Sequence, residues 1–190
     1  NERAIGADLS VRRRAGFVTG SAGIFVHRFR DYIFERELPA DAIPAAHNAE
    51  GLTPFQFVAT DAEFAGAELE LLFHLVETER RRLHLEVSAD GVRARETATR
   101  HPLPRTPPVR TGVRLSYEDG RWHGLIEWRR TARQDRLAAA ESATAGHSHL
   151  NASVSVLLPS SRGTCELFLR GRNLTNAAAR AHGSFLKEFS

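Results

Sequence analysis

The stretch HLNASVSVLL, from His149 to Leu158, alternates between polar and apolar side chains. Its even positions are apolar, namely Leu150, Ala152, Val154, Val156 and Leu158, and its odd positions from His149 to Ser155 are polar. Because successive side chains of a strand point to opposite faces of a sheet, this period of two predicts a β-strand with two unlike faces. The pattern decides the fold class, since it returns along the chain.

Three further segments alternate in the same way. They run from Ala65 to Leu75, from Leu83 to Ala89 and from Val109 to Tyr117. One face of each carries mainly alanine, valine, leucine, phenylalanine or threonine, and the other carries arginine, glutamate, serine or histidine. Four long amphipathic strands predict an all-β protein with antiparallel pairing.

The phase of this alternation changes at Asp90-Gly91. Leu83 to Ala89 has its apolar residues at odd positions, whereas Val92 and Ala94 are apolar at even positions. An extra residue in one strand shifts the phase in this way, and glycine often marks such places. We therefore predict a β-bulge at Gly91.

The connections between the alternating segments differ in length in a regular order. Three are short turns, at Glu77–Arg82, at Glu118–Arg121 with its Asp-Gly pair, and at Pro159–Gly163. Longer loop-like segments lie between them, at Glu37–Thr53, Thr99–Pro108 and Gln134–Gly146. In an up-and-down meander this order places all short turns at one end and all long loops at the other, as in an outer-membrane barrel.

The two faces leave two kinds of barrel open. The polar face carries charges in mid-strand, at Glu68, Glu70, Arg114, Glu127 and Arg129. A wide membrane barrel holds such residues in a water-filled lumen and turns its apolar face to lipid, with tryptophan and tyrosine at the interfaces. The alternative is a soluble, lipocalin-like barrel of about eight strands that binds a small ligand and has its apolar face inside. Alternation alone does not distinguish the two.

Composition excludes several functional classes. A hydrophobic content of 42% excludes wholesale disorder, and no apolar run is long enough for a membrane-spanning helix. A net charge of +3 without a concentrated basic face does not favour a nucleic-acid partner. Cys165 is the only cysteine, which excludes an internal disulfide. The sequence has no nucleophile elbow and no glycine-rich phosphate loop, so we expect no enzyme.

Five blocks resemble, in the same order, segments of the TonB-dependent outer-membrane receptors. The last block, NLTNAAARAHGSFLK, matches the family pattern at Asn173, Leu174, Thr175, Asn176, Ala179, Arg180, His182, Phe185, Leu186 and Lys187. FQFVATDAEFAGAELE matches it at Ala62, Phe64, Gly66, Glu68 and Glu70. The other blocks are RFRDYIFE, PLPRTPPVRTGVRLSY and ARQDRLAAAESATAGHSHLNASVSV. The blocks Pro102–Pro108 and Ser184–Lys187 resemble most the branch of the family associated with zinc uptake.

This resemblance implies a fold and a setting. It implies an antiparallel up-and-down transmembrane β-barrel, of which residues 1–190 are the C-terminal portion with about eight or nine strands of a larger barrel. The plug domain, the first half of the barrel and the final strand are expected to lie outside this chain, so that the chain alone does not transport. The implied partners are outer-membrane lipid of a Gram-negative bacterium and the TonB complex, which acts through the plug.

The resemblance also implies a cargo. The expected function is import into the periplasm of a scarce metal or metal chelate, such as zinc, a ferric siderophore or haem, with no resident cofactor. His147 and His149 are the candidate metal ligands, because a spacing of two just before a strand directs both imidazoles to the polar side. Carboxylates from nearby loops would complete the site, at Asp41, Glu50, Asp135 or Glu141. The alternative is that both histidines are solvated rim residues in place of aromatic ones.

Overall fold

The computed structural model describes residues 1–38, 54–139, 141–161 and 163–184, and these form one antiparallel sheet. In this part of the chain the strands are β1 (Arg3–Arg13), β2 (Val18–Glu37), β3 (Phe55–Glu77), β4 (Arg81–Glu96), β5 (Arg110–Asp119), β6 (Trp122–Thr131), β7 (His147–Ser160) and β8 (Gly163–Gly171). Each strand pairs with the next one along the chain, so the order in the sheet is the order in the sequence. The prediction of an all-β, antiparallel up-and-down fold is confirmed.

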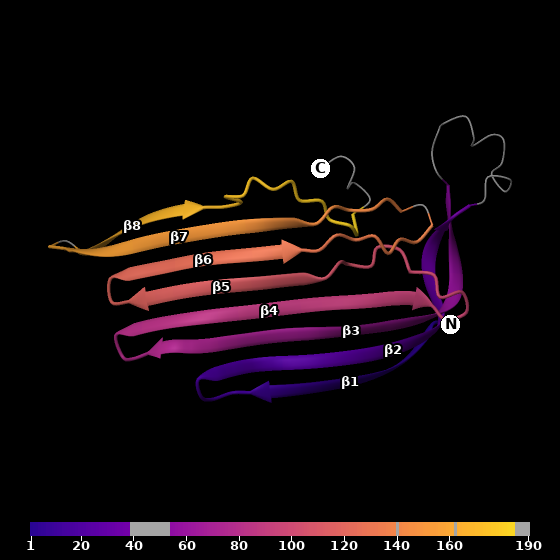
Figure 1. Cartoon of the computed structure of the whole chain (residues 1–190), viewed down its shortest axis with the longest axis horizontal. Helices are drawn as coiled ribbons and strands as arrows, with labels where there is room; N and C mark the ends of the chain where they lie inside the picture. Colours follow the sequence, from indigo (N-terminus) through magenta and orange to yellow (C-terminus); the bar gives the residue numbers. More distant parts are fainter. Residues whose placement is uncertain (39–53, 140, 162, 185–190) are drawn as a thin grey trace.

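Short and long connections alternate along the meander, as predicted. The connections that begin at Arg14, Thr78, Gly120 and Ser161 are short, and their ends of the sheet lie together on the left in Figure 1. The connections that begin at Leu38, Thr97 and Ala132 are long and leave the opposite end. We call these two ends the short-turn end and the long-loop end.

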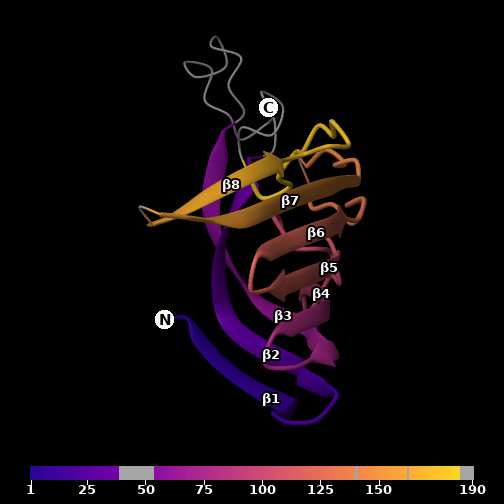
Figure 2. The ribbon, with the colours of Figure 1, turned by 90° about the vertical axis from the view of Figure 1, so that its left-hand side faces the viewer.

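The register assigns every strand residue to one of two faces. Residues opposite each other across a pair of strands share a face, so Glu86, Arg114 and Glu127 lie together, as do Leu85, Leu115 and Ile126. We call these the polar face and the apolar face. The sheet is curved like part of a barrel wall (Figure 2). Polar-face residues from β4 to β8, including His84 and Arg170, line one hollow of about 560 Å³, which places the polar face on the inside of the curve.

The apolar face has almost no cover within the chain. Ile24 and Ile126 are 59% and 46% exposed, and exposed apolar-face residues occur on every described strand except β4, where they are half-buried. On β3 the apolar band runs from Ala65 to Phe73 and ends at Glu63, a length that suits the roughly 9–11 residues with which a tilted strand crosses a bilayer. An exposed apolar surface of this size needs a cover that the described residues do not supply.

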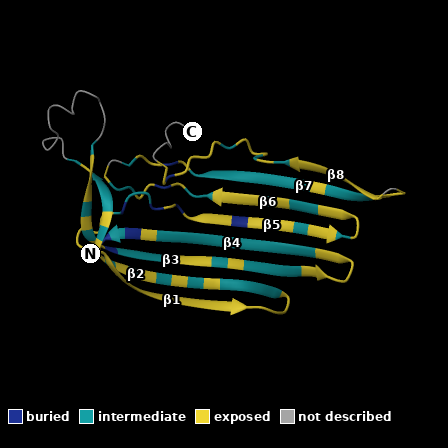
Figure 3. Cartoon of the chain, turned by 180° about the vertical axis from the view of Figure 1, so that it is seen from behind, coloured by how far each residue is buried: buried dark blue, intermediate teal, exposed yellow. Residues whose placement is uncertain are grey.

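Buried residues gather at the long-loop end (Figure 3). The buried hydrophobic residues in the described ranges are Ala62, Ala94 and Leu103, with aromatic rings of β2 and β3 packed against them. The Leu103 N–H donates to the Ala94 carbonyl at 3.0 Å, which holds the connection after β4 against the polar face. The described residues contain no helix long and apolar enough to cross a membrane.

The predicted bulge at Gly91 is wrong. The β3–β4 register is continuous there, with Gly91 opposite Ala67 and Ala94 opposite Phe64. Ala94 is apolar because it lies on the polar face beneath Leu103, where the connection after β4 covers the sheet. The change of phase therefore reflects a local apolar cover on the inner face, and the chain inserts no residue at this point.

The irregularities of register lie elsewhere. One falls between Phe29 and Tyr32 in β2, where Asp31 has a φ of 55° and the far ends of β2 and β3 turn away from the line of the sheet (Figure 1). The other falls between His74 and Val76 in β3, which makes Leu75 an extra residue relative to β4. Each is a β-bulge, which bends a strand and re-aims the side chains beyond it.

The sheet is open within the described residues. β1 pairs only with β2, and β8 pairs only with β7. A lipocalin-like barrel of about eight strands requires its last strand to pair with its first and its apolar residues to point inward. The observed sheet does neither, so the soluble alternative does not fit this fold.

Candidate metal-binding residues on the polar face

Charged side chains on the polar face are paired across neighbouring strands. Glu127 of β6 accepts hydrogen bonds from Arg114 at 2.7 Å and from Asn151 at 3.0 Å, and lies 2.9 Å from an Arg129 nitrogen. Arg114 also reaches Glu86 of β4 at 3.5 Å. The register explains this network, because these strands place the four main partners directly opposite one another. Mid-strand charges thus satisfy each other across neighbouring strands of the polar face.

His147 and His149 lie side by side at the start of β7. Their ring centroids are 4.9 Å apart and nearly perpendicular. The His149 Nδ1 atom lies 3.2 Å from the Asn173 Oδ1 atom, and the His147 Nδ1 atom is buried without a hydrogen-bond partner in the described ranges. The structure therefore brings the two predicted ligands together at the long-loop end of the polar face.

The carboxylates expected to complete that site are not beside it in the described residues. Glu141 accepts a hydrogen bond from the Arg105 N–H at 2.6 Å and lies 3.4 Å from a His182 nitrogen. Neither Asp135 nor Glu141 forms a three-ligand group with His147 and His149 in the part of the chain that the structure describes. Asp41 and Glu50 lie outside the described residues. The two histidines remain a predicted site.

The Asn-Leu-Thr-Asn block forms tight turns after β8. Asn173 and Asn176 have φ angles of 49° and 48°, in the left-handed region that asparagine tolerates. The Asn173 side chain accepts a hydrogen bond from the Ala177 N–H at 2.9 Å, and the Thr175 hydroxyl donates to the Ser148 carbonyl at 2.7 Å. These bonds return the chain to β7, next to His149. Phe185, Leu186 and Lys187, which match the family pattern at the end of this block, lie outside the described residues.

The sequence interpretation missed another group of metal-type ligands. His74, Glu77 and His84 place one ligand atom each within 4.8 Å of one another, at the short-turn end of the polar face. Both histidines fall on the polar parity of predicted strands joined by a predicted short turn, so their proximity could have been inferred from the hairpin. The contribution of Glu77 could not, because it depends on the bulge at Leu75.

Comparison with known proteins supports the fold. No family model matches the chain. A solved structure, the copper transporter OprC, superposes on 96% of this chain with a TM-score of 0.78 and 19% sequence identity. The chain therefore shares the fold of the matched segment of that protein, an antiparallel up-and-down sheet. It covers 27% of the matched chain, so it spans about a quarter of that protein's length. The match does not support the narrower resemblance to the zinc-uptake branch.

Proposed function

We propose that this chain is part of the barrel wall of a TonB-dependent outer-membrane receptor that imports a metal ion or a metal chelate. The observation that carries the proposal is the curved sheet, which has an exposed apolar face outside and an ion-paired polar face inside. The similarity to a copper transporter supports the same role. The rest of the barrel and a plug would be supplied by sequence beyond these residues, and the TonB complex would act through the plug.

The polar face favours a borderline metal as cargo. Imidazole nitrogens suit zinc and copper ions, whereas magnesium and calcium prefer oxygen ligands. Polar-face histidines occur at both ends of the sheet, with His147 and His149 at the long-loop end and His74 and His84 at the short-turn end. Among the cargoes that the resemblance implies, Zn²⁺ fits this ligand chemistry best. Cu²⁺, which is not among those cargoes, fits the same ligands.

His147 and His149 are proposed to contact the cargo. In outer-membrane barrels the longer loops are extracellular, so the long-loop end is the side from which a cargo enters. The buried and unpartnered His147 Nδ1 atom offers a lone pair or a proton that no described protein group uses. A third ligand would come from the cargo's own chelator or from residues outside the described ranges.

Uptake by whole cells tests the proposal. The gene is deleted, and accumulation of Zn²⁺ and Cu²⁺ is followed under metal limitation in the deletion strain, in the strain complemented at natural length, and in a complemented strain that lacks TonB. We expect accumulation to return on complementation and to require TonB, with the protein in the outer-membrane fraction. Recovery of the protein in the soluble fraction, or equal accumulation in all strains, would refute the proposal. His147→Asn with His149→Asn is expected to lower uptake without loss of protein from the membrane.

A further inference from the structure

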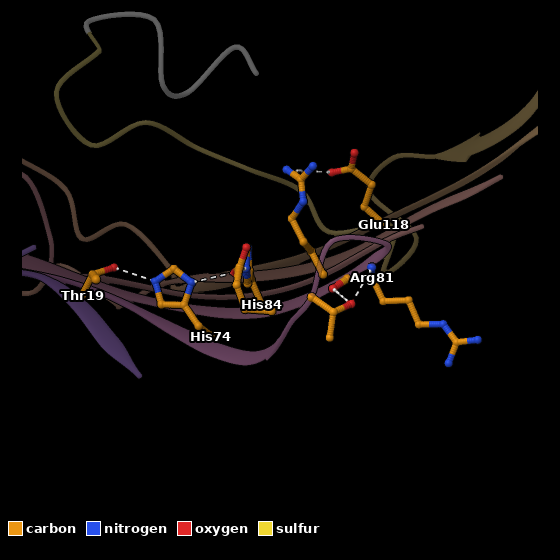
Figure 4. A network of polar contacts seen from close by, with 8 residues as sticks. Thr19, His74, Arg81, His84 and Glu118 are labelled. Atoms are coloured by element: carbon orange, nitrogen blue, oxygen red, sulfur yellow. Dashed lines mark hydrogen bonds and ion pairs between the residues drawn. The ribbon is translucent and has the colours of Figure 1, made fainter. Parts of the chain in front are cut away.

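His74 and His84 are direct partners across β3 and β4 (Figure 4). Their imidazole rings have centroids 4.8 Å apart and an interplanar angle of 79°. Both side chains are mostly shielded, with 23% and 21% exposed. Two imidazoles on one face, at this separation and edge to face, can direct nitrogen lone pairs to a common point.

The bulge at Leu75 brings a carboxylate to the same point. In a regular strand Glu77 would lie three residues from His74 and therefore on the opposite, apolar face. The extra residue restores it to the polar face, where Glu77 stands opposite Arg82. The Glu77 Oε2 atom lies 3.1 Å from His74 Nδ1 and 2.5 Å from His84 Nε2.

These three atoms fit the ligand set of a tetrahedral metal site. Two histidines and one carboxylate are a known protein ligand set for zinc with one open position, and two ligand atoms each about 2.0–2.1 Å from a tetrahedral ion are about 3.3 Å apart. The observed separation of 3.1 Å between Glu77 and His74 is close to that value, and all three atoms lie within 4.8 Å of one another.

A neighbouring strand fixes the orientation of one ligand. The Thr19 hydroxyl of β2 lies 3.0 Å from His74 Nε2 (Figure 4), whereas Glu77 lies beside the other ring nitrogen, Nδ1. When Nε2 carries the proton and donates it to Thr19, Nδ1 is left as a lone pair directed at Glu77. Metal-binding histidines in proteins are commonly oriented in this way by a hydrogen bond from their other nitrogen.

Glu77 also differs from the carboxylates of the ion-pair network. Glu127 contacts Arg114 and Arg129, whereas the ion-pair contacts of Glu77 in the described residues are with the two histidines. Arg82, which stands opposite Glu77, turns instead to Glu118 of β5 at 3.7 Å (Figure 4). The carboxylate therefore keeps its negative charge for the imidazole pair, and for any cation bound between them.

The group is open to water. It lies in a groove of about 870 Å³ whose other lining residues include Arg12, Ser21 and Glu70 on the inner face of β1 to β3. Glu77 itself is 52% exposed, so an ion can reach the three ligands from the lumen side. Water, or an anion drawn by Arg12, can take the open coordination position.

We propose that His74, Glu77 and His84 bind a divalent transition-metal ion of the zinc class on the inner wall, at the short-turn end. This proposal goes beyond the proposed function, because it concerns a second position on the wall and holds whatever the cargo is.

Zinc binding by the purified protein tests the proposal. The protein is isolated from outer membranes at natural length, stripped with chelator and dialysed against buffered Zn²⁺, and bound zinc is counted by elemental analysis. His74→Asn and His84→Asn are each expected to lose one zinc equivalent, whereas His123→Asn, a polar-face histidine of β6 outside the group, is expected to keep it. Equal zinc content and affinity in all four proteins would overturn the proposal. Heat-dependent migration in gel electrophoresis checks that each variant remains a folded barrel.

Two further variants separate this site from its alternatives. Thr19→Val is expected to keep the stoichiometry and weaken Zn²⁺ binding by about 10–100-fold, the usual effect of removing a partner of a ligand. With Cu²⁺ as the probe, electron paramagnetic resonance should report two nitrogen ligands, and one after His84→Asn. The double variant His147→Asn and His149→Asn should keep this zinc equivalent even if it abolishes uptake, so the two proposals fail independently. Unchanged copper spectra in His84→Asn would refute the assignment.

Discussion

Placing an arginine at the centre of the apolar face tests which side of the sheet meets lipid. Leu115 of β5 faces Leu85 on one side and Ile126 on the other, in the middle of the apolar band. Thr111 lies on the same face four residues nearer the long-loop end. With a rise of about 3.4 Å per residue and a tilt of about 40°, the two positions differ in depth by roughly 10 Å.

The expected cost follows from this difference in depth. An arginine on the lipid face of a membrane barrel costs about 2–4 kcal/mol at the bilayer midplane and about 0–1 kcal/mol near the interfaces. Leu115→Arg should therefore lower the free energy of unfolding by about 3 kcal/mol, and Thr111→Arg by less than about 1 kcal/mol. Ser116→Arg, next to Leu115 but on the polar face, should be nearly neutral because the new charge points to water.

Reversible unfolding by denaturant in lipid vesicles measures these differences at natural chain length. The ratio of effects is decisive, since all three variants add the same side chain to the same strand. Equal costs at Leu115 and Thr111 would contradict a depth-dependent lipid face. A larger cost at Ser116 than at Leu115 would show that the polar face, and not the apolar face, is the desolvated one.

Three other substitutions test particular contacts, and denaturant unfolding measures each. Glu127→Leu removes the partner of Arg114, Arg129 and Asn151 and should lower the free energy of unfolding by about 2–3 kcal/mol. Glu68→Leu on the same face is the control and should lower it by under about 0.5 kcal/mol. Equal costs would show that the network adds no stability. Leu103→Ala, at a residue only 2% exposed, should cost about 2–4 kcal/mol and expose the connection after β4 to protease; unchanged proteolysis would contradict its anchoring role. Gly20→Ala should lower the free energy of unfolding by more than about 1–3 kcal/mol, because Gly20 has a φ of 143° and a Cβ there would lie 2.0 Å from the Glu70 carbonyl oxygen. Gly124→Ala is the control expected to be tolerated, since its Cβ would meet no atom closer than 4.0 Å.

The period of two was sufficient to predict the fold class and the order of the connections. It was insufficient for the length of β3, which begins at Phe55, ten residues before the alternation starts at Ala65. Phe55 to Phe64 has apolar residues on both parities, because this segment pairs with the far end of β2 and lies near the packed aromatic cluster. Ala62 and Phe64 on the polar face join this cluster, whereas Phe55 and Phe57 on the apolar face are exposed, so apolar residues occur on both parities and the alternation disappears.

The candidate metal site was predictable only where it depends on the spacing of residues within one strand. The proximity of His147 and His149 follows from their spacing, and they do lie together. The partners of Glu141 do not follow from spacing, because they come from the connection after β4 and the segment after β8, which meet only in the folded chain. Local periodicity carries no information about contacts between loops that are distant in sequence.

The extra residue at Leu75 has a consequence for how sequences of this kind are compared. A substitution at His74 or Glu77 changes one ligand, but deletion of Leu75 changes none and leaves Glu77 two residues after His74, still on the polar face. The same carboxylate position can therefore be reached by two spacings, His-Leu-Val-Glu with a bulge and His-Val-Glu without one. An alignment that allows one gap at this point can therefore match chains that hold the carboxylate beside the two imidazoles with either spacing.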